Sequence, residues 1–252
     1  MHSSKSLVGF QEPPSGEILV KHTGEFFSCC TYRLECIRLY LNQNARLPKG
    51  VKSEFLFSWY KPLTQLQKDI TFDYFADYNK HFINLETKTT QQAINQTIIK
   101  KYFSPSLGIK LIISRLKYKY NLDHLSGNKS ICALVYYKAN RLRINYNELL
   151  EQAKKVQTTN KDVVFIIQSD TSEFLQVANK TFPGNIIFKD EIRFISENLK
   201  QSIETIDREH NYIYSKYLLA TFYIISSCKI LICDTPIDHK LWIELLSLTT
   251  KD

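Results

Sequence analysis

The chain has 252 residues, of which 44% are hydrophobic and 23% are charged, so it can build an ordinary core and is not a disordered or fibrous protein. Its seven glycines are too widely spaced for a dinucleotide fingerprint or a Walker A loop, which argues against a dinucleotide oxidoreductase and a P-loop kinase or ATPase. The net charge is +8. Residues 1–126 contain 17 basic and 10 acidic residues, and 127–252 contain 16 and 15. This asymmetry predicts an anionic partner for the first half, and solubility is the alternative reason for its charge.

The first half has weaker patterns than the second, and its predicted elements are short. They are a strand at 18–21, a helix at 28–42, an extended run at 55–60, an aromatic-rich segment at 69–75, and helices at 91–102 and 107–120. The helix at 107–120 interleaves lysine with tyrosine, as a surface for single-stranded nucleic acid would. Because no RNA-binding or zinc motif accompanies it, we expect no nucleic-acid partner and keep that function as a distant alternative.

The second half alternates continuous apolar strands with helices. Strands are predicted at 131–137, 163–167, 186–188 and 230–233, and helices at 147–156, 172–180, 196–202, 212–226 and 237–247. Such alternation favours a parallel sheet that is covered on both faces, hence an α/β fold with a doubly wound C-terminal domain. Residues 126–129 read as a hinge, so we predict domains at 1–126 and 127–252.

Ligands of open parallel sheets bind beyond the carboxyl ends of the strands. The four segments that follow the predicted strands are all polar: 137–143, 168–171, 189–193 and 234–239. They therefore predict a ligand site at this edge. Lys138, Arg141, Arg143 and Arg193 supply cations there, and Ser169, Asp170, Asp234 and Thr235 supply oxygens. Taken singly, Ser169, Asp170 and Thr235 have an alternative interpretation as helix caps.

Several kinds of chemistry lack their residues in this sequence. No G-x-S-x-G, H-E-x-x-H, cysteine–histidine metal cluster or D-x-D motif occurs, so we expect no metal and no cofactor. A bound phosphate would then be held by lysine, arginine and helix N-termini. We interpret His210 and His239 as surface or packing residues. The longest apolar run, around 218–226, is too short to span a membrane, and 1–8 carry no signal-peptide run, which predicts a cytoplasmic protein.

The run at 163–174 resembles the element of fucosyltransferase-like GT-B glycosyltransferases in which a strand is followed by S/T-D-D/E. The likeness continues at 182–183, 188–193, 217–220 and 226–233. The chain is also similar to glycosyltransferases of large DNA viruses of algae and amoebae, in 24–30, 47–48 and 59–61. A viral enzyme of this kind would work in the host cytoplasm.

This resemblance implies a GT-B fold, with two Rossmann-type domains and a cleft between them. Residues 1–126 would bind a glycan or glycoprotein acceptor, and 127–252 a nucleotide-diphosphate sugar of the GDP-fucose or UDP-xylose type. Transfer would proceed without metal and with inversion, which needs a carboxylate base. We assign the role of base to Asp73, which lies among aromatic residues, then to Glu25 and then to Asp69; the alternative for Asp73 is a turn or solvated carboxylate. Diphosphate contacts are assigned to Lys138, Arg141, Arg193 and Arg208, and nucleoside or sugar contacts to Ser169, Asp170, Asp234 and Thr235. Trp59 and Tyr60 are assigned to the acceptor, with core packing as the alternative for the tryptophan.

Two segments depart from the family pattern. Residues 138–141 read Lys-Ala-Asn-Arg where the family has an Arg-Gly-Asn-Asp-like run, and 234–238 are bulkier and more acidic than the family's small loop. Both departures argue against GDP-fucose as the donor and are compatible with another nucleotide sugar, such as UDP-xylose. They leave open an alternative function, a non-catalytic glycan- or nucleotide-binding protein of the same fold.

Overall fold

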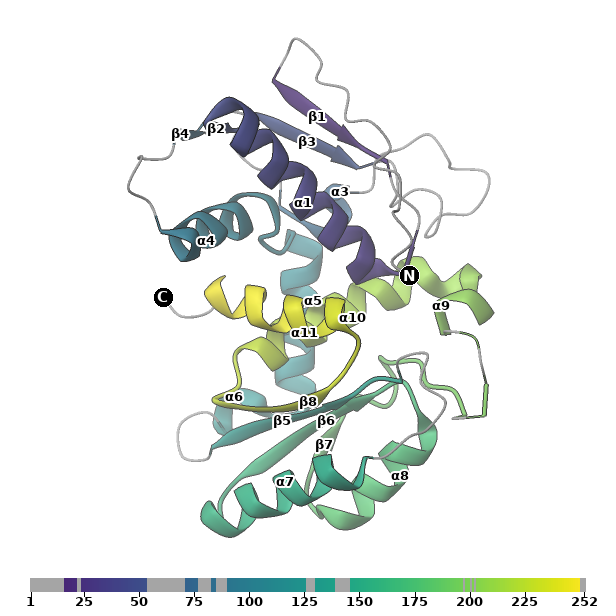
Figure 1. Ribbon diagram of the computed structural model, residues 1–252. Coiled ribbons are helices and arrows are strands. Elements are labelled where there is room, and N and C mark those ends of the chain that lie inside the picture. The colour runs from purple at the N-terminus through teal and green to yellow at the C-terminus, as the bar shows by residue number, and fades with distance from the viewer. Residues whose placement is uncertain are drawn as a thin grey trace, which may run out of the picture. The chain divides into compact units, whose positions relative to one another are not determined.

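The computed structural model describes residues 16–21, 24–53, 71–76, 83–84, 90–125, 130–138, 146–196, 198–199, 201 and 203–249 (Figure 1). The chain divides into two compact units, Met1–Ser106 and Leu107–Asp252. The boundary predicted from the sequence lies between 126 and 127, so the helices of 107–125 belong to the second unit and not to the first.

Unit 1 contains, in its described part, helices and two small sheets. The helices are α1 (Phe26–Asn44), α3 (Thr71–Tyr74) and α4 (Gln91–Tyr102); strand β1 (Glu17–Val20) pairs in parallel with β3 (Gly50–Ser53), and β2 (Arg46–Leu47) pairs antiparallel with β4 (Ile83–Asn84). The predicted helices at 28–42 and 91–102 are confirmed. Helix α1 ends at Ala45, whose φ of 53° is left-handed and turns the chain into β2.

Unit 2 is built on a four-stranded parallel sheet with the order β7-β6-β5-β8. The strands are β5 (Ile131–Tyr136), β6 (Val164–Ser169), β7 (Ile186–Ile187) and β8 (Ile230–Asp234). Their apolar, β-branched sequences suit strands that are covered on both faces. The predicted parallel α/β sheet is therefore confirmed, and its strand order is compatible with a Rossmann-like fold.

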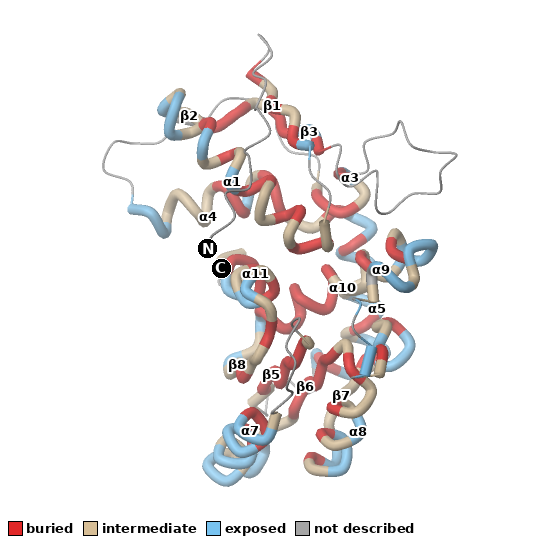
Figure 2. Tube along the Cα trace, turned by 45° about the vertical axis from the view of Figure 1, so that its right-hand side comes forward, coloured by how far each residue is buried: buried red, intermediate tan, exposed pale blue. Residues whose placement is uncertain are grey.

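Helices cover both faces of this sheet (Figure 1). Helices α7 (Asn147–Thr159) and α8 (Ser172–Thr181) lie on one face, and α5 (Leu107–Lys119), α10 (Asn211–Ser226) and α11 (Ile237–Leu246) on the other. The first pair closes a core in which Leu149, Leu150 and Ala153 meet Phe174 and the inward side chains of β5 and β6. Figure 2 shows buried residues along β5 and β6 and exposed residues on the outer side of α7.

The short helix α6 (Leu122–Leu125) follows α5, and the end of α5 is fixed to the segment after β7. Lys119 Nζ donates to Asp190 Oδ2 at 2.8 Å and to Glu191 Oε1. Tyr120 Oη donates to Glu191 Oε2 at 2.8 Å, and its ring contacts Phe188 edge-on at 4.9 Å between centroids. Glu191 is 92% buried, so these bonds replace the water that its carboxylate loses. They are one reason that α5 belongs to unit 2.

The predicted helix at 196–202 is wrong. The described residues there form turns and bends, and the short helix α9 (Ile203–Ile206) begins later. Just before this segment, the Ile195 N–H donates to Asp170 O at 2.8 Å and its C=O accepts from the Ser172 N–H at 3.0 Å. These bonds keep Ile195 extended beside the end of β6.

Among the described residues, no helix combines the length and the apolar character needed to cross a membrane.

Candidate functional site

The strand order of unit 2 defines the position of the candidate site. From β5 the sheet runs through β6 to β7 on one side, and β8 lies on the other side, so the order reverses between β5 and β8. The connections that leave the carboxyl ends of two such strands run in opposite directions. The crevice between them is where ligands bind in open parallel sheets. Tyr136 pairs with Asp234 at this point, and the Tyr137 N–H donates to Asp234 O at 3.0 Å.

Lys138 leaves β5 at this edge and is held at both of its ends. Its backbone N–H donates to Asp170 Oδ1 at 2.8 Å, and its Nζ donates to Leu199 O at 2.8 Å. The structure therefore brings together Lys138 and Asp170, two residues that the sequence predicted separately. Asp170 links the ends of β5 and β6 through its side chain. Arg141 and Arg143 lie outside the described residues.

Ser169 is fully buried, as is Thr171. The Thr171 N–H donates to Ser169 Oγ at 3.0 Å, and the two hydroxyl oxygens are 3.1 Å apart. These bonds stabilise the turn into α8 and leave no exposed hydroxyl for a ligand. The first turn of α8 already carries the Glu173 carboxylate. Its oxygens accept from Ser172 Oγ at 2.8 Å and from Ser196 Oγ at 2.7 Å. An anion would be repelled there.

The N-terminus of α11 differs from that of α8. Pro236 is its N-cap residue and makes no side-chain capping hydrogen bond. Thr235 precedes it and is 91% buried, with its hydroxyl donating to Pro236 O at 3.3 Å. The first N–H groups of a helix and the helix dipole favour an anion at this end. The carboxylate of Asp238, in the same turn, opposes that preference.

A buried polar cluster lies beneath the edge, between the sheet and α10. Gln168 is fully buried, and its Nε2 donates to Tyr137 Oη at 2.7 Å and to Thr221 Oγ1 at 3.0 Å. The Tyr137 ring contacts the imidazole of His239, with 4.7 Å between centroids. Burial lowers the pKa of His239 from 6.5 to about 4, so the imidazole is neutral at physiological pH. The packing role predicted for His239 is confirmed.

Arg193 makes a different set of contacts from those predicted for it. Its Nη1 donates to Asp207 O at 2.6 Å, its Nη2 donates to Asn211 Oδ1 at 2.8 Å, and its guanidinium lies 5.0 Å from the Tyr214 ring centroid. Burial tends to raise the pKa of Asp207, but hydrogen bonds from His210 and Arg193 outweigh it and lower that pKa. Arg193 therefore joins the segment around α9 to the start of α10. Arg208, next to Asp207, is exposed.

Asp73 and Glu25, the first and second of the predicted bases, lie in unit 1. Glu25 is the half-buried N-cap residue of α1, and its side chain makes no capping hydrogen bond. Asp73 is half-buried in α3, and its backbone C=O accepts from Ser106 Oγ at 3.0 Å. The rings of Phe26 and Tyr74 lie 5.1 Å apart, so each carboxylate is next in sequence to one ring of a packed pair. Trp59, Tyr60 and Asp69 lie outside the described residues.

Arg33, in unit 1, is a residue that the sequence analysis did not single out. It is fully buried in α1, where its Nη1 donates to Val51 O at 3.2 Å and to Ser53 Oγ. The guanidinium lies over the rings of Phe75 and Phe103, at 5.8 and 5.4 Å from their centroids. The sequence pattern could have indicated that Arg33 is buried. Arg33 lies at helical spacing on the same face of α1 as four buried apolar residues: Phe26, Cys30, Ile37 and Tyr40.

Comparisons with protein-family models, with curated proteins and with solved structures found no match to this chain. Among the residues that the structure describes, no group of three or more histidine, cysteine, aspartate or glutamate side chains is arranged to hold a metal ion.

Proposed function

We propose that unit 2 binds a nucleotide-diphosphate sugar at the carboxyl edge of its sheet, and that the chain is a glycosyltransferase that acts without a metal ion. The observation that carries the proposal is the strand order β7-β6-β5-β8, which reverses between β5 and β8 where Lys138 and the N-terminus of α11 lie. Nucleotides bind at such reversals in parallel α/β sheets. The resemblance to GT-B glycosyltransferases supplies the reaction and the role of unit 1 as the acceptor side.

The proposed diphosphate contacts are the Lys138 ammonium, the first N–H groups of α11, and the cations of Arg141 and Arg208. Lys138 is the best supported of the side chains, because its backbone is fixed by Asp170 at the carboxyl edge and its Nζ donates to a backbone carbonyl that a phosphate oxygen can replace. Arg193 and Ser169 receive structural roles in this proposal, since their described contacts are internal.

In the proposed reaction an acceptor hydroxyl oxygen attacks the anomeric carbon of the donor sugar. A carboxylate of unit 1, Asp73 or Glu25, takes the hydroxyl proton as the new C–O bond forms. The bond between the anomeric carbon and the diphosphate oxygen breaks, and both of its electrons leave with the diphosphate. The cations and N–H groups of the edge stabilise the charge that develops on this leaving group.

Calorimetric titration of the full chain with UDP and GDP tests donor binding. We expect one nucleotide to bind, and Lys138→Gln to weaken it by about 10- to 100-fold, as for the loss of a hydrogen bond to a charged group. Lys161→Gln is the matched control, because Lys161 is an exposed lysine that precedes β6 at the opposite end of the strand. Equal affinity of both variants and the unaltered chain, or no binding of either nucleotide, would contradict the proposed site.

A second candidate function is a nucleotide- or glycan-binding protein without catalytic activity. Specific observations favour it: Ser169 is fully buried, Thr235 is nearly so, and Asp238 lies in the turn where phosphate would bind. An assay of nucleotide release from a panel of UDP- and GDP-sugars separates the two functions. Release that depends on an added glycan acceptor supports the transferase, whereas nucleotide binding without any turnover supports the binding protein.

A further inference from the structure

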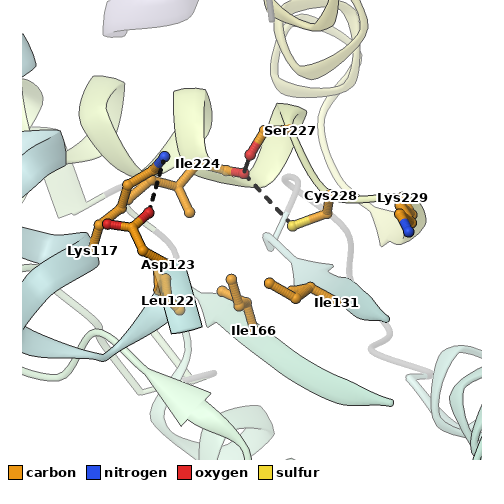
Figure 3. Close-up of a pocket in the computed structure, with 9 residues that line it drawn as sticks. All are labelled: Lys117, Leu122, Asp123, Ile131, Ile166, Ile224, Ser227, Cys228 and Lys229. Atoms are coloured by element: carbon orange, nitrogen blue, oxygen red, sulfur yellow. Dashed lines mark hydrogen bonds and ion pairs between the residues drawn. The ribbon is translucent and has the colours of Figure 1, made fainter. Parts of the chain in front are cut away.

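Unit 2 contains a cavity of about 120 Å³ on the face of the sheet that α5 and α10 cover. It lies towards the amino-terminal ends of the strands, where Ile131 begins β5 and Lys229 immediately precedes β8. The five residue steps of β5 separate it by about 16 Å from the carboxyl edge. Its lining consists of Lys117, Leu122, Asp123, Ile131, Ile166, Ile224, Ser227, Cys228 and Lys229 (Figure 3).

The centre of the cavity is apolar. Figure 3 shows Ile131 and Ile166 rising from the strands towards Ile224 of α10, with Leu122 and Cys228 on opposite sides. Burial raises the pKa of the Cys228 thiol to about 12, so this group is neutral and adds to the apolar wall. An engineered apolar cavity of about 150 Å³ holds one benzene molecule, so the volume here suits a single ring or a short branched chain.

The charges around the cavity favour an anion. Two lysines line it, Lys117 and Lys229, against one carboxylate, Asp123, which lies 3.6 Å from the Lys117 Nζ. Lys229 makes no ion pair with any residue that the structure describes, and its side chain is exposed. The Ser227 hydroxyl is already used, since it donates to Ile224 O at 2.6 Å. Because Asp123 pairs with Lys117, the polar part of an anionic ligand would meet the Lys229 ammonium.

We propose that this cavity is a binding site for a ring-sized apolar group that carries a carboxylate, such as a small aromatic or branched-chain acid. The isoleucines and Leu122 bury the apolar body, and Lys229, on the Cys228 side of the cavity, neutralises the carboxylate. The site is separate from the nucleotide edge and does not depend on sugar transfer.

Isoleucine δ1-methyl labelling of the full chain makes the test specific, because three lining residues are isoleucines. We expect benzoate to shift the methyl signals of Ile131, Ile166 and Ile224 and to leave those of Ile98 and Ile99, which are buried in unit 1, unchanged. Toluene and benzylamine match benzoate in size. Toluene should bind about two- to fivefold more weakly because it lacks the exposed ion pair, and benzylamine more weakly still. Absence of shifts with benzoate, or tightest binding of benzylamine, would overturn the proposal.

Two further variants separate the body of the ligand from its charge. Lys229→Gln should bring benzoate binding to the level of toluene without changing toluene binding. Ile224→Phe and Cys228→Leu each fill the cavity from a different wall, so either one should abolish the shifts at Ile131 and Ile166. Using both keeps the test valid if one variant fails to fold. Persisting shifts in a folded filled variant would place the probe elsewhere and refute the site.

Discussion

The backbone N–H of Lys138 donates to the carboxylate of Asp170, with 2.8 Å between the nitrogen and Oδ1. This bond joins the ends of β5 and β6, two strands that already pair in parallel up to Tyr136 and Ser169. Because the sheet bonds stop at these residues, the aspartate side chain supplies the next link. It fixes the backbone from which the Lys138 side chain leaves.

We therefore expect Asp170→Ala to lower the free energy of unfolding by about 1.5–3 kcal/mol, the range for a hydrogen bond to a charged group. Asp170→Asn keeps an acceptor oxygen and should lose less. Urea unfolding followed by circular dichroism measures both values. If the alanine variant is as stable as the unaltered chain, the carboxylate does not link the two strands.

Arg193 gives a prediction that opposes the role implied by the family resemblance. Its guanidinium holds Asp207 and Asn211, so Arg193→Ala should destabilise the chain by about 1.5–3 kcal/mol. Arg193→Lys should recover only part of this, because an ammonium cannot present the same planar fork to two acceptors. Lys189→Ala removes an exposed cation and serves as the control. Unchanged stability with a large loss of nucleotide affinity would instead place Arg193 in the donor site.

The parallel sheet could be predicted because its strands are continuous apolar runs, a pattern that reflects burial on both faces. Residues 131–137, 163–167 and 230–233 needed no tertiary information to be recognised. The segment at 196–202 was predicted wrongly for the opposite reason. Its described residues make bonds to elements distant in sequence, from Ser196 Oγ to Glu173 Oε1 and from Lys138 Nζ to Leu199 O.

The polar segments beyond the strands could be predicted from the sequence, but the contacts of their side chains could not. The rule on strand ends identified Lys138 and Asp170, yet their mutual bond depends on the register of β5 and β6. Ser169 and Arg193 have the residue types of ligand-binding groups. Their internal bonds arise from local turn geometry and from the packing of α10, which spacing in the sequence does not encode.

The burial of His239 makes the free energy of unfolding depend on pH. In the unfolded chain it takes up a proton near its ordinary pKa of 6.5, whereas burial delays protonation in the folded chain to about pH 4. Because the imidazole is a base with a lower pKa in the folded chain, its protonation favours the unfolded chain. The free energy of unfolding therefore falls as the pH falls from about 6.5 to about 4. The full loss is about 3 kcal/mol from this histidine.

His239→Phe should remove most of that dependence, since phenylalanine keeps a ring against Tyr137 and Phe222 but cannot titrate. Urea unfolding at several values between pH 7 and pH 4.5 measures the slope. The unaltered chain is the reference. A slope that is the same in both proteins would show that His239 is not the titrating group.

Two tyrosines near the end of α5 offer a matched pair of variants. Tyr120→Phe deletes the hydroxyl that donates to the buried Glu191 carboxylate, and should cost about 1–3 kcal/mol. Tyr118→Phe makes the same chemical change at a side chain that is 89% exposed, and should be neutral. Thermal unfolding of both variants compares them. Equal midpoints would mean that the bond to Glu191 does not hold α5 in unit 2.

The last prediction concerns the proposed base. Asp73→Asn keeps the size of the side chain and removes its ability to take a proton, so transfer should fall by about 100-fold or more. Nucleotide affinity should stay unchanged, because the proposed donor site lies in unit 2 and Asp73 in unit 1. Glu25→Gln is the parallel variant, since Glu25 precedes Phe26 in the ring pair that Tyr74 completes. The transfer rate and the calorimetric affinity of each variant must be read together. Loss of transfer in the glutamine variant alone would make Glu25 the base, and full activity in both variants would exclude both carboxylates, because no acid–base role is compatible with an amide at that position.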